Sequence, residues 1–591
     1  MSETNKKEYT NDPALEDEMK KMKACYDHHT DSGTLHNEDG NDEVYYSDGP
    51  EPTEEDWKNL PEISDKIPFS AYLVILIEFC ERFTYYGLSG PFQNYIQNPN
   101  PIEGFPAKLP GALGRGQQTA TALTTFFQFF CYITPIVGAV IADQYLGKYN
   151  TIVLFACIYF VGLIILTCSS IPPSIESGGA FPGFVVSLVI IGFGTGGIKS
   201  NVSPLVAEQY IQKSPFVKTL ANGKKAIVTP QATYQKIFNM FYWCINIGSL
   251  SAIATTELEK NVGFWPAYLL PTLMFIPCLI VVVLGRKRYI QNPPRGSVFV
   301  EAGRIFTMTF KIKGGLDECK PSNLIKSHPE LLHKATWDDI FVDELKRTLK
   351  ACVVFCWFPI YWLCYSQMTN NLISQAGTMQ TGNVPNDIMQ NIDPICLIIF
   401  IPIMDSFVYP FLRKIGIPMG PILRISLGFF FAAVAMGYTA GVQAMIYNSP
   451  PYYDHPEGPN DISGALIIPS YVFIAISEIF ASITGLEYAY KKAPQSMKSI
   501  VMALFLFTNC IASILAFALV SVAVDPKLEW MYTGISATAG ICSVLFYICH
   551  RKNDDTDAAE DAIIRSDEEV KKQKQEHNRI ISEYEVEKGA I

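Results

Sequence analysis

The stretch Glu78-Phe-Cys-Glu81-Arg82-Phe-Thr-Tyr85-Tyr86-Gly87 places two carboxylates and a guanidinium in an apolar segment long enough to cross a bilayer. Each charge costs about 2.5–3.5 kcal/mol at the centre of a membrane helix, so lipid would not tolerate all three. The charged residues and both tyrosines recur at helical spacing and share one face. We therefore interpret this face as a polar site in a transport pathway. The alternative interpretation is a structural ion-pair cluster that locks two helices.

The composition of the whole chain is typical of a membrane protein. Of 591 residues, 49% are hydrophobic and only 17% are charged. The net charge of −11 comes mainly from the two tails, and we find no basic patch that would bind nucleic acid. No basic-then-apolar leader precedes the first apolar segment, so we expect that segment to direct membrane insertion. The irregularly spaced cysteines, without clustered His, predict neither a disulfide framework nor a zinc site.

Apolar runs of about 20 residues predict an all-α membrane protein with helices in two pseudo-symmetric six-helix bundles. The predicted spans are 69–97, 118–142, 150–170, 182–205, 234–254, 264–285, 347–369, 388–411, 418–446, 464–490, 497–523 and 530–549. This number of spans excludes a seven-helix receptor. The sequence also lacks the repeated pore loop that would indicate a channel.

A polar central segment divides the predicted spans into two equal groups. The expected divisions are an acidic disordered tail (1–66), an N-terminal bundle (67–286), a linker with a lateral helix (287–346), a C-terminal bundle (347–550) and a charged tail (551–591). Basic residues concentrate in the even-numbered connections between spans. The positive-inside rule therefore predicts a multi-pass protein with both termini in the cytoplasm.

The fourth predicted span contains Gly196-Gly197-Ile-Lys199, which joins small residues to a buried ammonium. The glycines permit a neighbouring helix to approach closely. Because a Gly-rich phosphate loop follows a β-strand, this run inside a membrane helix does not predict a nucleotide site. The economical ion-pair partner of Lys199 is Glu78 or Glu81.

The second predicted bundle contributes two acids at membrane depth, Asp393 beside a proline and Glu478 near mid-span. Positive charge from Lys199 on one wall and negative charge on the other suits a zwitterion. Tyr242 and Asn246 lie one turn apart on the fifth span, where they can hydrogen-bond amide groups without selecting one side chain.

Three further polar residues lie near the predicted cytoplasmic ends of spans. Asp143 and Lys148 flank a tight Gly-containing turn after the second span, which favours a gating or topological role over substrate binding. Glu487, near the end of the tenth span, is predicted to be a gating residue, or simply to be solvated or paired with Lys491.

Several long motifs, in order along residues 67–550, carry a family resemblance. The motifs are Glu78-x-x-Glu81-Arg82-Phe-x-Tyr-Tyr86, Gly138-x-x-x-Ala-Asp143-x-x-Leu-Gly147-Lys148-Tyr149-x-Thr151, Gly196-Gly197-Ile-Lys199-x-Asn201-Val-Ser203, Phe241-Tyr242-x-x-Ile-Asn246-x-Gly248-Ser249-Leu250 and Thr484-Gly-Leu-Glu487-Tyr-x-Tyr-x-x-Ala-Pro494-x-x-Met497-Lys498-Ser499. The chain resembles the proton-coupled oligopeptide transporters of the major facilitator superfamily, most of all the fungal members.

The resemblance implies a role for most of these polar residues. Glu78, Glu81 and Arg82 would couple protons, with Lys199 as the salt-bridge partner of the acids and as a contact for the peptide carboxylate. Glu478 would accept the peptide amino terminus. The remaining residues expected at the substrate are Tyr86, Tyr132, Tyr242, Asn246, Asp393 and Ser482.

The sequence also departs from the family pattern. Asp393 stands where the family usually has Asn, and Tyr365 or Ser366 stands where many members have an acid. Ser89 stands where many bacterial members have a second basic residue, and Phe505 stands where the family has a tryptophan in the eleventh helix. These replacements affect the expected seventh-helix gate and side-chain selectivity.

The resemblance implies a plasma-membrane symporter that imports di- and tripeptides by alternating access, with a co-transported proton and no other cofactor. We expect a monomer in the lipid bilayer, with ubiquitin-type regulation of the cytoplasmic tails. Another small solute such as nitrate, or an added nutrient-receptor role, remains an alternative. No nucleophile with a paired His, metal cluster or cofactor loop indicates an enzyme.

Overall fold

A computed structural model describes residues 50–560 apart from short gaps. The gaps are 51, 54–55, 57–59, 101–108, 213–214, 221–222, 295–297, 313–314, 329–330, 332–334, 416–418, 453–458 and 493–496. The described chain forms two compact units, one from residues up to 67 with 211–236 and one from 68–210 with residues from 237 onward. Most of the predicted acidic and charged tails, residues 1–49 and 561–591, lie outside the described residues.

The smaller unit contains a three-stranded sheet of order β1-β3-β2. Its strands are β1 (Glu62–Ile63), β2 (Phe216–Thr219) and β3 (Lys225–Val228). β3 pairs antiparallel with β2 and parallel with β1, and Lys218 Nζ lies 3.1 Å from Asp65 Oδ1. Strands this short carry too few residues for an alternating pattern to be detected, so the sheet is not predictable from the sequence pattern.

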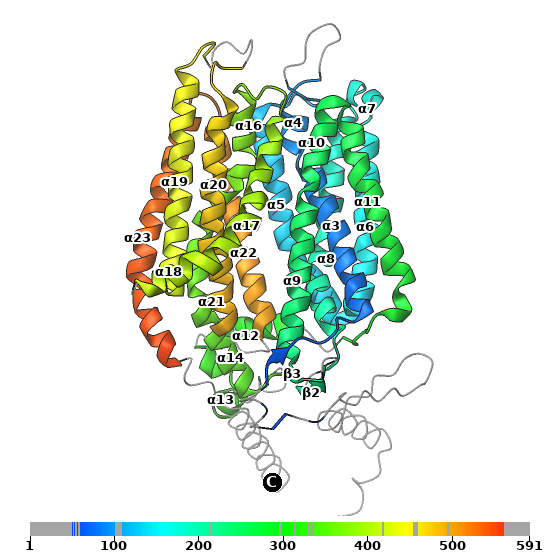
Figure 1. Cartoon of the computed structure of the whole chain (residues 1–591), viewed down its shortest axis with the longest axis vertical. Coiled ribbons are helices and arrows are strands. Elements are labelled where there is room, and N and C mark those ends of the chain that lie inside the picture. Colours follow the sequence, from blue (N-terminus) through cyan, green and yellow to red (C-terminus); the bar gives the residue numbers. More distant parts are fainter. Residues whose placement is uncertain are drawn as a thin grey trace, which may run out of the picture. The chain divides into compact units, whose positions relative to one another are not determined.

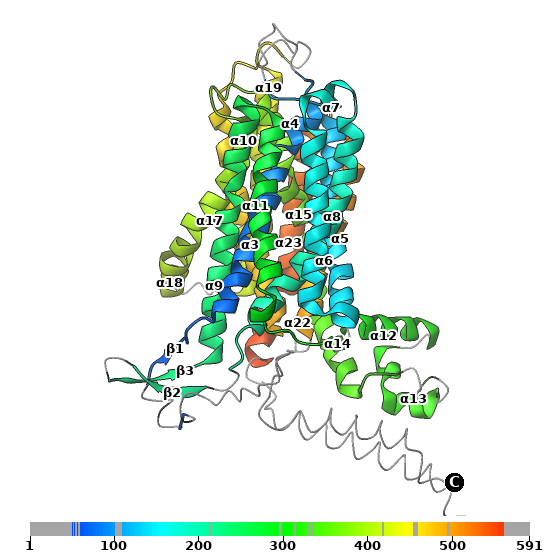
Figure 2. The ribbon, with the colours of Figure 1, turned by 90° about the vertical axis from the view of Figure 1, so that its right-hand side faces the viewer.

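The larger unit is helical, and its N-terminal half runs from α3 to α11 (Figures 1 and 2). The elements are α3 (Phe69–Ser89), α4 (Phe92–Gln97), α5 (Gly116–Ile141), the π-helix η1 (Ala142–Leu146), α6 (Gly147–Ser169), α7 (Pro172–Glu176), α8 (Ala180–Glu208), α9 (Pro230–Ser249), α10 (Ser251–Asn261) and α11 (Phe264–Leu284). Gly147 begins α6 with a φ of 74°, a conformation that glycine adopts without strain.

The linker and the C-terminal half follow α11. The linker contains η2 (Arg286–Arg288), α12 (Val298–Ile312), η3 (Leu316–Cys319), α13 (Pro321–Ser327) and α14 (Asp339–Ala351). The C-terminal half contains η5 (Cys352–Trp357), α15 (Phe358–Ser366), η6 (Gln367–Thr369), α16 (Asn371–Gly377), η7 (Asn386–Asn391), α17 (Ile392–Ile403), η8 (Met404–Val408), α18 (Tyr409–Lys414), α19 (Pro421–Tyr447), η9 (Gly464–Ile467), α20 (Ile468–Glu478), η10 (Ile479–Ile483), α21 (Thr484–Lys492), α22 (Lys498–Leu519), η12 (Val520–Val522) and α23 (Leu528–Glu560).

Among the described residues, 10 helical segments are long and apolar enough to cross a membrane. One of them, 116–169, contains both α5 and α6, so it supplies two of the predicted spans. α3 is not among the 10, because it carries Glu78, Glu81 and Arg82 within its 21 residues. The segments are therefore consistent with the predicted plan of twelve spans.

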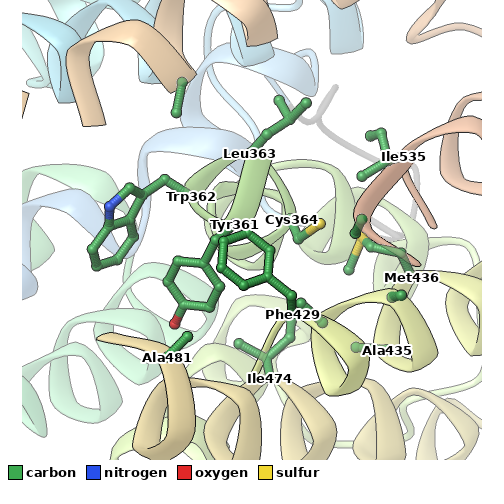
Figure 3. Close-up of a cluster of buried hydrophobic side chains, with 14 of the residues drawn as sticks. Tyr361, Trp362, Leu363, Cys364, Phe429, Ala435, Met436, Ile474, Ala481 and Ile535 are labelled. Atoms are coloured by element: carbon green, nitrogen blue, oxygen red, sulfur yellow. The ribbon is translucent and has the colours of Figure 1, made fainter. Parts of the chain in front are cut away.

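The core of the C-terminal half joins four helices that are distant in sequence. Tyr361 and Trp362 of α15 pack with Phe429 of α19, Ile474 of α20 and Ile535 of α23 (Figure 3). The Tyr361 ring lies 4.9 Å from the Trp362 ring and 6.0 Å from the Phe429 ring, in both cases edge to face. Such pairs stabilise a buried aromatic cluster beyond the area that they bury.

The linker has its own apolar core. Ile305 of α12, Leu324 of α13 and Leu345 of α14 are buried together, and Trp337 Nε1 donates a hydrogen bond to the Cys319 carbonyl at 3.0 Å. Met497 and Ile500, at the start of α22, belong to the same core. The predicted linker with one lateral helix is thus a packed group of helices attached to the C-terminal half.

Small residues bring α5 and α8 into close contact, as the sequence predicts. A Cβ added at Gly138 would lie 2.6 Å from the Gly197 Cα and 3.1 Å from the Gly196 carbonyl oxygen. We expect Gly138→Ala to lower stability by about 1–3 kcal/mol, because a packed interface does not absorb an extra methyl group. Thermal unfolding of the purified protein measures this effect. Gly441→Ala is the control, since no atom lies within 4 Å of the added Cβ, and an unchanged melting temperature for Gly138→Ala would contradict the prediction.

Candidate functional site

α3 holds a buried ion-pair cluster of Glu78, Glu81 and Arg82. Each of the three is at most 5% exposed. Arg82 Nε lies 3.1 Å from Glu78 Oε1, one helical turn away, and the Arg82 guanidinium also pairs with Glu81. Thr195 of α8 donates a hydrogen bond from Oγ1 to Glu81 Oε1 at 3.1 Å. One guanidinium therefore faces two carboxylates, which leaves the cluster with one net negative charge when both acids are ionised.

Lys199 of α8 lies beside this cluster without joining it. Its Nζ is 4.1 Å from the centre of the Tyr132 ring, in a cation–π contact. Within the described residues it forms no ion pair, so the predicted Lys199 bridge to Glu78 or Glu81 is absent in this conformation. Arg82 takes both acids because it shares their helix and needs no movement between helices to reach them. Lys199 remains within electrostatic range of both carboxyl groups.

The C-terminal half brings Asp393 and Glu478 together. Asp393, in the first turn of α17, is 3% exposed, and Glu478 ends α20 just before the π-helix η10. The Tyr365 hydroxyl of α15 is within hydrogen-bonding reach of both carboxyl groups. Asp393 Oδ1 and Glu478 Oε2 are buried without a hydrogen-bond donor among the described residues. Among the described residues, neither acid forms an ion pair with a basic side chain.

Predicted residues of the N-terminal half face this acidic pair. Glu478 acts electrostatically on Tyr86, Tyr132 and Tyr242, which come from α3, α5 and α9. Asn246 donates a hydrogen bond to the Tyr242 carbonyl at 3.0 Å. Ser482 lies half-buried in η10. The three tyrosines of the N-terminal half are therefore within electrostatic range of Glu478 in the C-terminal half.

Asp143 and Lys148 flank the turn at Gly147 near the linker end, as the sequence predicts. Lys148 pairs with Glu208 at the end of α8, an acid that the sequence analysis did not single out. Asp143 in η1 is within electrostatic range of both. Glu487 in α21 is exposed. Glu208 was missed because it lies just beyond the predicted fourth span, although an acid ending a membrane helix opposite Lys148 was the available signal.

At the end opposite the linker helices, α4 of the N-terminal half lies close to α16 of the C-terminal half (Figure 1). Polar side chains join the two halves there. Gln93 of α4 donates to Ser374 Oγ of α16 at 3.0 Å, and Thr121 of α5 donates to Asn371 Oδ1 at 3.0 Å. Gln128 of α5 donates to Thr369 Oγ1 at 2.8 Å. The structure is therefore closed at this end.

Comparison with known proteins identifies the family of this chain. Residues 149–536 match the family model described as the POT family. The chain belongs to the POT family. A probable peptide transporter of Schizosaccharomyces pombe is 54% identical over 508 residues, covering 85% of this chain and 81% of that protein. A peptide transporter of Saccharomyces cerevisiae is 44% identical over 522 residues, with 88% and 85% covered.

Solved structures of POT-family proteins share the fold. The crystal structure of an auto-inhibited POT family peptide transporter is similar with a TM-score of 0.65 at 22% identity, covering 82% of this chain and 97% of that one. The transporter PepTSo has a TM-score of 0.64 at 22% identity, with 83% and 99% covered. The resemblance and the fold class predicted from the sequence are confirmed. This POT-family chain is a membrane transporter and not an enzyme.

Proposed function

We propose that the protein is a proton-coupled symporter that imports di- and tripeptides by alternating access. The observation that carries this proposal is the charge separation between the halves. The N-terminal half presents Lys199 beside Glu78, Glu81 and Arg82, and the C-terminal half presents Glu478 and Asp393, which form no ion pair among the described residues. The fungal relatives named as peptide transporters support the same substrate class.

Charge balance explains how a proton would act at the N-terminal site. Two ionised acids with Arg82 and Lys199 sum to zero, so Lys199 is electrostatically satisfied without a substrate. A proton on Glu78 or Glu81 leaves one net positive charge beside Lys199. A peptide carboxylate then restores neutrality, so proton and peptide bind together more favourably than either alone.

The peptide orientation follows from the two sites. Its carboxylate would face Lys199, and its ammonium group would face Glu478, where Asp393 and Tyr365 lie close by. Tyr86, Tyr132 and Tyr242 lie between, with hydroxyl groups that bind peptide amides irrespective of the side chains. Occupancy of both sites draws the halves together and favours the conformational change.

The remaining aspects of the proposal concern cellular context. The protein would work as a monomer in the plasma membrane, with both termini and the linker in the cytoplasm. The co-transported proton would be its only cofactor. Lysines of the tails, outside the described residues, would be the targets of ubiquitin-type regulation.

Uptake by proteoliposomes tests the proposal directly. With an inwardly directed proton gradient, we expect concentrative uptake of labelled di- and tripeptides and weaker uptake of tetrapeptides. Collapse of the gradient with a protonophore should abolish accumulation, and nitrate should not compete. Uptake that is insensitive to the protonophore, or that is driven by nitrate but not peptide, would refute the assignment.

A further inference from the structure

A second pair of acids lies at the closed end, apart from the cluster on α3. Glu259 of α10 is 2% exposed, and Asp387 of η7 is fully buried. They come from opposite halves, and their carboxyl groups are within hydrogen-bonding reach of each other. Two ionised carboxylates have no donor to share, so this contact requires a proton on one of them.

A pair of asparagines holds the two acids in place. The amides of Asn94 of α4 and Asn386 of η7 bond reciprocally, at 2.9 and 3.0 Å. Asn94 Nδ2 also donates to Glu259 Oε1 at 3.0 Å. The amide pair therefore joins the N-terminal and C-terminal halves. It fixes Glu259 opposite Asp387, because Asn94 bonds Glu259 and Asn386 is the sequence neighbour of Asp387.

The other carboxyl oxygens have no partner except each other. Glu259 Oε2 and both Asp387 oxygens are buried without a hydrogen-bond donor among the described residues. Within that part of the chain neither acid forms an ion pair, and no group of three metal-ligating residues is present. The charged groups that act on Asp387 are Glu257 and Lys260 of α10, with opposite signs. Tyr268 of α11 and Tyr471 of α20 are the titratable neighbours on the other packed helices.

We propose that Glu259 and Asp387 form a second proton-binding site, in which one proton shared between the two halves holds the end opposite the linker closed. Loss of that proton leaves two buried negative charges facing each other, so the halves separate at this end. The closed conformation binds the extra proton, and its population therefore falls as the pH rises. This inference rests on the proposed alternating opening of the two halves, but it requires no peptide.

Distance measurements on the full-length protein in lipid nanodiscs test the site. Noncanonical amino acids that carry spin labels replace Ser177 and Asn448, which are both exposed, so the native cysteines stay in place. The distance between the two labels reports the separation of the halves at this end. Without peptide, we expect the open-to-closed ratio to rise between pH 5 and pH 8, by at most about tenfold per pH unit for one linked proton. Glu259→Gln supplies an amide donor to Asp387, so this variant should stay closed across the whole range. Asp387→Asn should behave in the same way.

Control variants separate this site from the α3 cluster. Glu257→Gln, on the same helix but outside the acid pair, should keep a pH response of wild-type size, with its midpoint moved to lower pH because the Glu257 charge also acts on Asp387. Glu81→Gln should also keep it, even where peptide uptake is lost. A wild-type distance distribution independent of pH would overturn the proposal, as would a wild-type response in Glu259→Gln. A response that follows added calcium or magnesium at constant pH would assign the pair to a cation and would equally overturn it. Peptide uptake by proteoliposomes that contain the same variants reports separately on the proposed function.

Discussion

Glu81→Gln is expected to abolish proton-driven accumulation of peptide while leaving exchange of peptide across the membrane intact. Glutamine keeps the size and hydrogen-bonding capacity of the side chain but removes its charge, so Arg82 is left balanced by Glu78 alone. The α3 cluster then permanently resembles its protonated state. The drive lost is large, because a proton moving down 100 mV and one pH unit supplies about 2.3 plus 1.4 kcal/mol, enough for accumulation on the order of several hundred-fold.

The measurement compares two assays on the same proteoliposomes. Under a proton gradient, the final ratio of internal to external dipeptide should fall to near one in Glu81→Gln, whereas counterflow into peptide-loaded vesicles should continue. Glu176→Gln, an exposed acid after the third span, is the matched control and should accumulate peptide like the wild type. Full accumulation by Glu81→Gln would remove Glu81 from proton coupling.

Lys199→Ala is expected to weaken binding of peptides that carry a free carboxylate, and to leave binding of carboxyl-amidated peptides nearly unchanged. Removing one partner of a buried charge pair costs about 2–5 kcal/mol, which corresponds to at least about 30-fold in Kd. Because Lys199 touches the Tyr132 ring and no acid in this conformation, the variant leaves no ion pair of the described chain broken.

A second variant tests which end of the peptide each charged residue contacts. Glu478→Gln should show the opposite pattern, with weaker binding of peptides that have a free amino terminus and little change for N-acetylated peptides. Isothermal titration with the four peptide forms separates the two effects. An equal loss for all four forms in both variants would indicate general disruption of the site, and would contradict contacts to opposite ends of the peptide.

The sequence predicts the charged residues of the site, because a charge inside a membrane span is too costly to be there without a function. Glu78, Glu81, Glu478 and Asp393 were recognised because each charge at membrane depth is costly. Their partners were not predictable to the same degree. Arg82 lies one helical turn from Glu78 and Lys199 is a buried ammonium on another span, so both were possible partners of the acids. Only the side-chain conformations decide between them.

Other features escaped prediction because they depend on contacts between distant segments. Glu259 and Asp387 lie near the ends of predicted spans, where acids are normally solvated, and only packing of η7 against α10 buries them. The plan of twelve spans could be predicted, because the length of an apolar segment is read directly from the local sequence. The sheet of β1, β2 and β3 does not follow from local patterns, since β1 is far in sequence from its partner β3.

The linker core has a mechanical consequence for the two halves. α14 continues directly into η5, and Met497, just before α22, and Ile500 of α22 belong to the same core as Trp337. The linker helices α12, α13 and α14 therefore share one apolar core with the start of α22 in the C-terminal half. A phosphate group or a binding protein attached to α12 or α13 would therefore act on the C-terminal half through this core. It would not contact the cluster on α3.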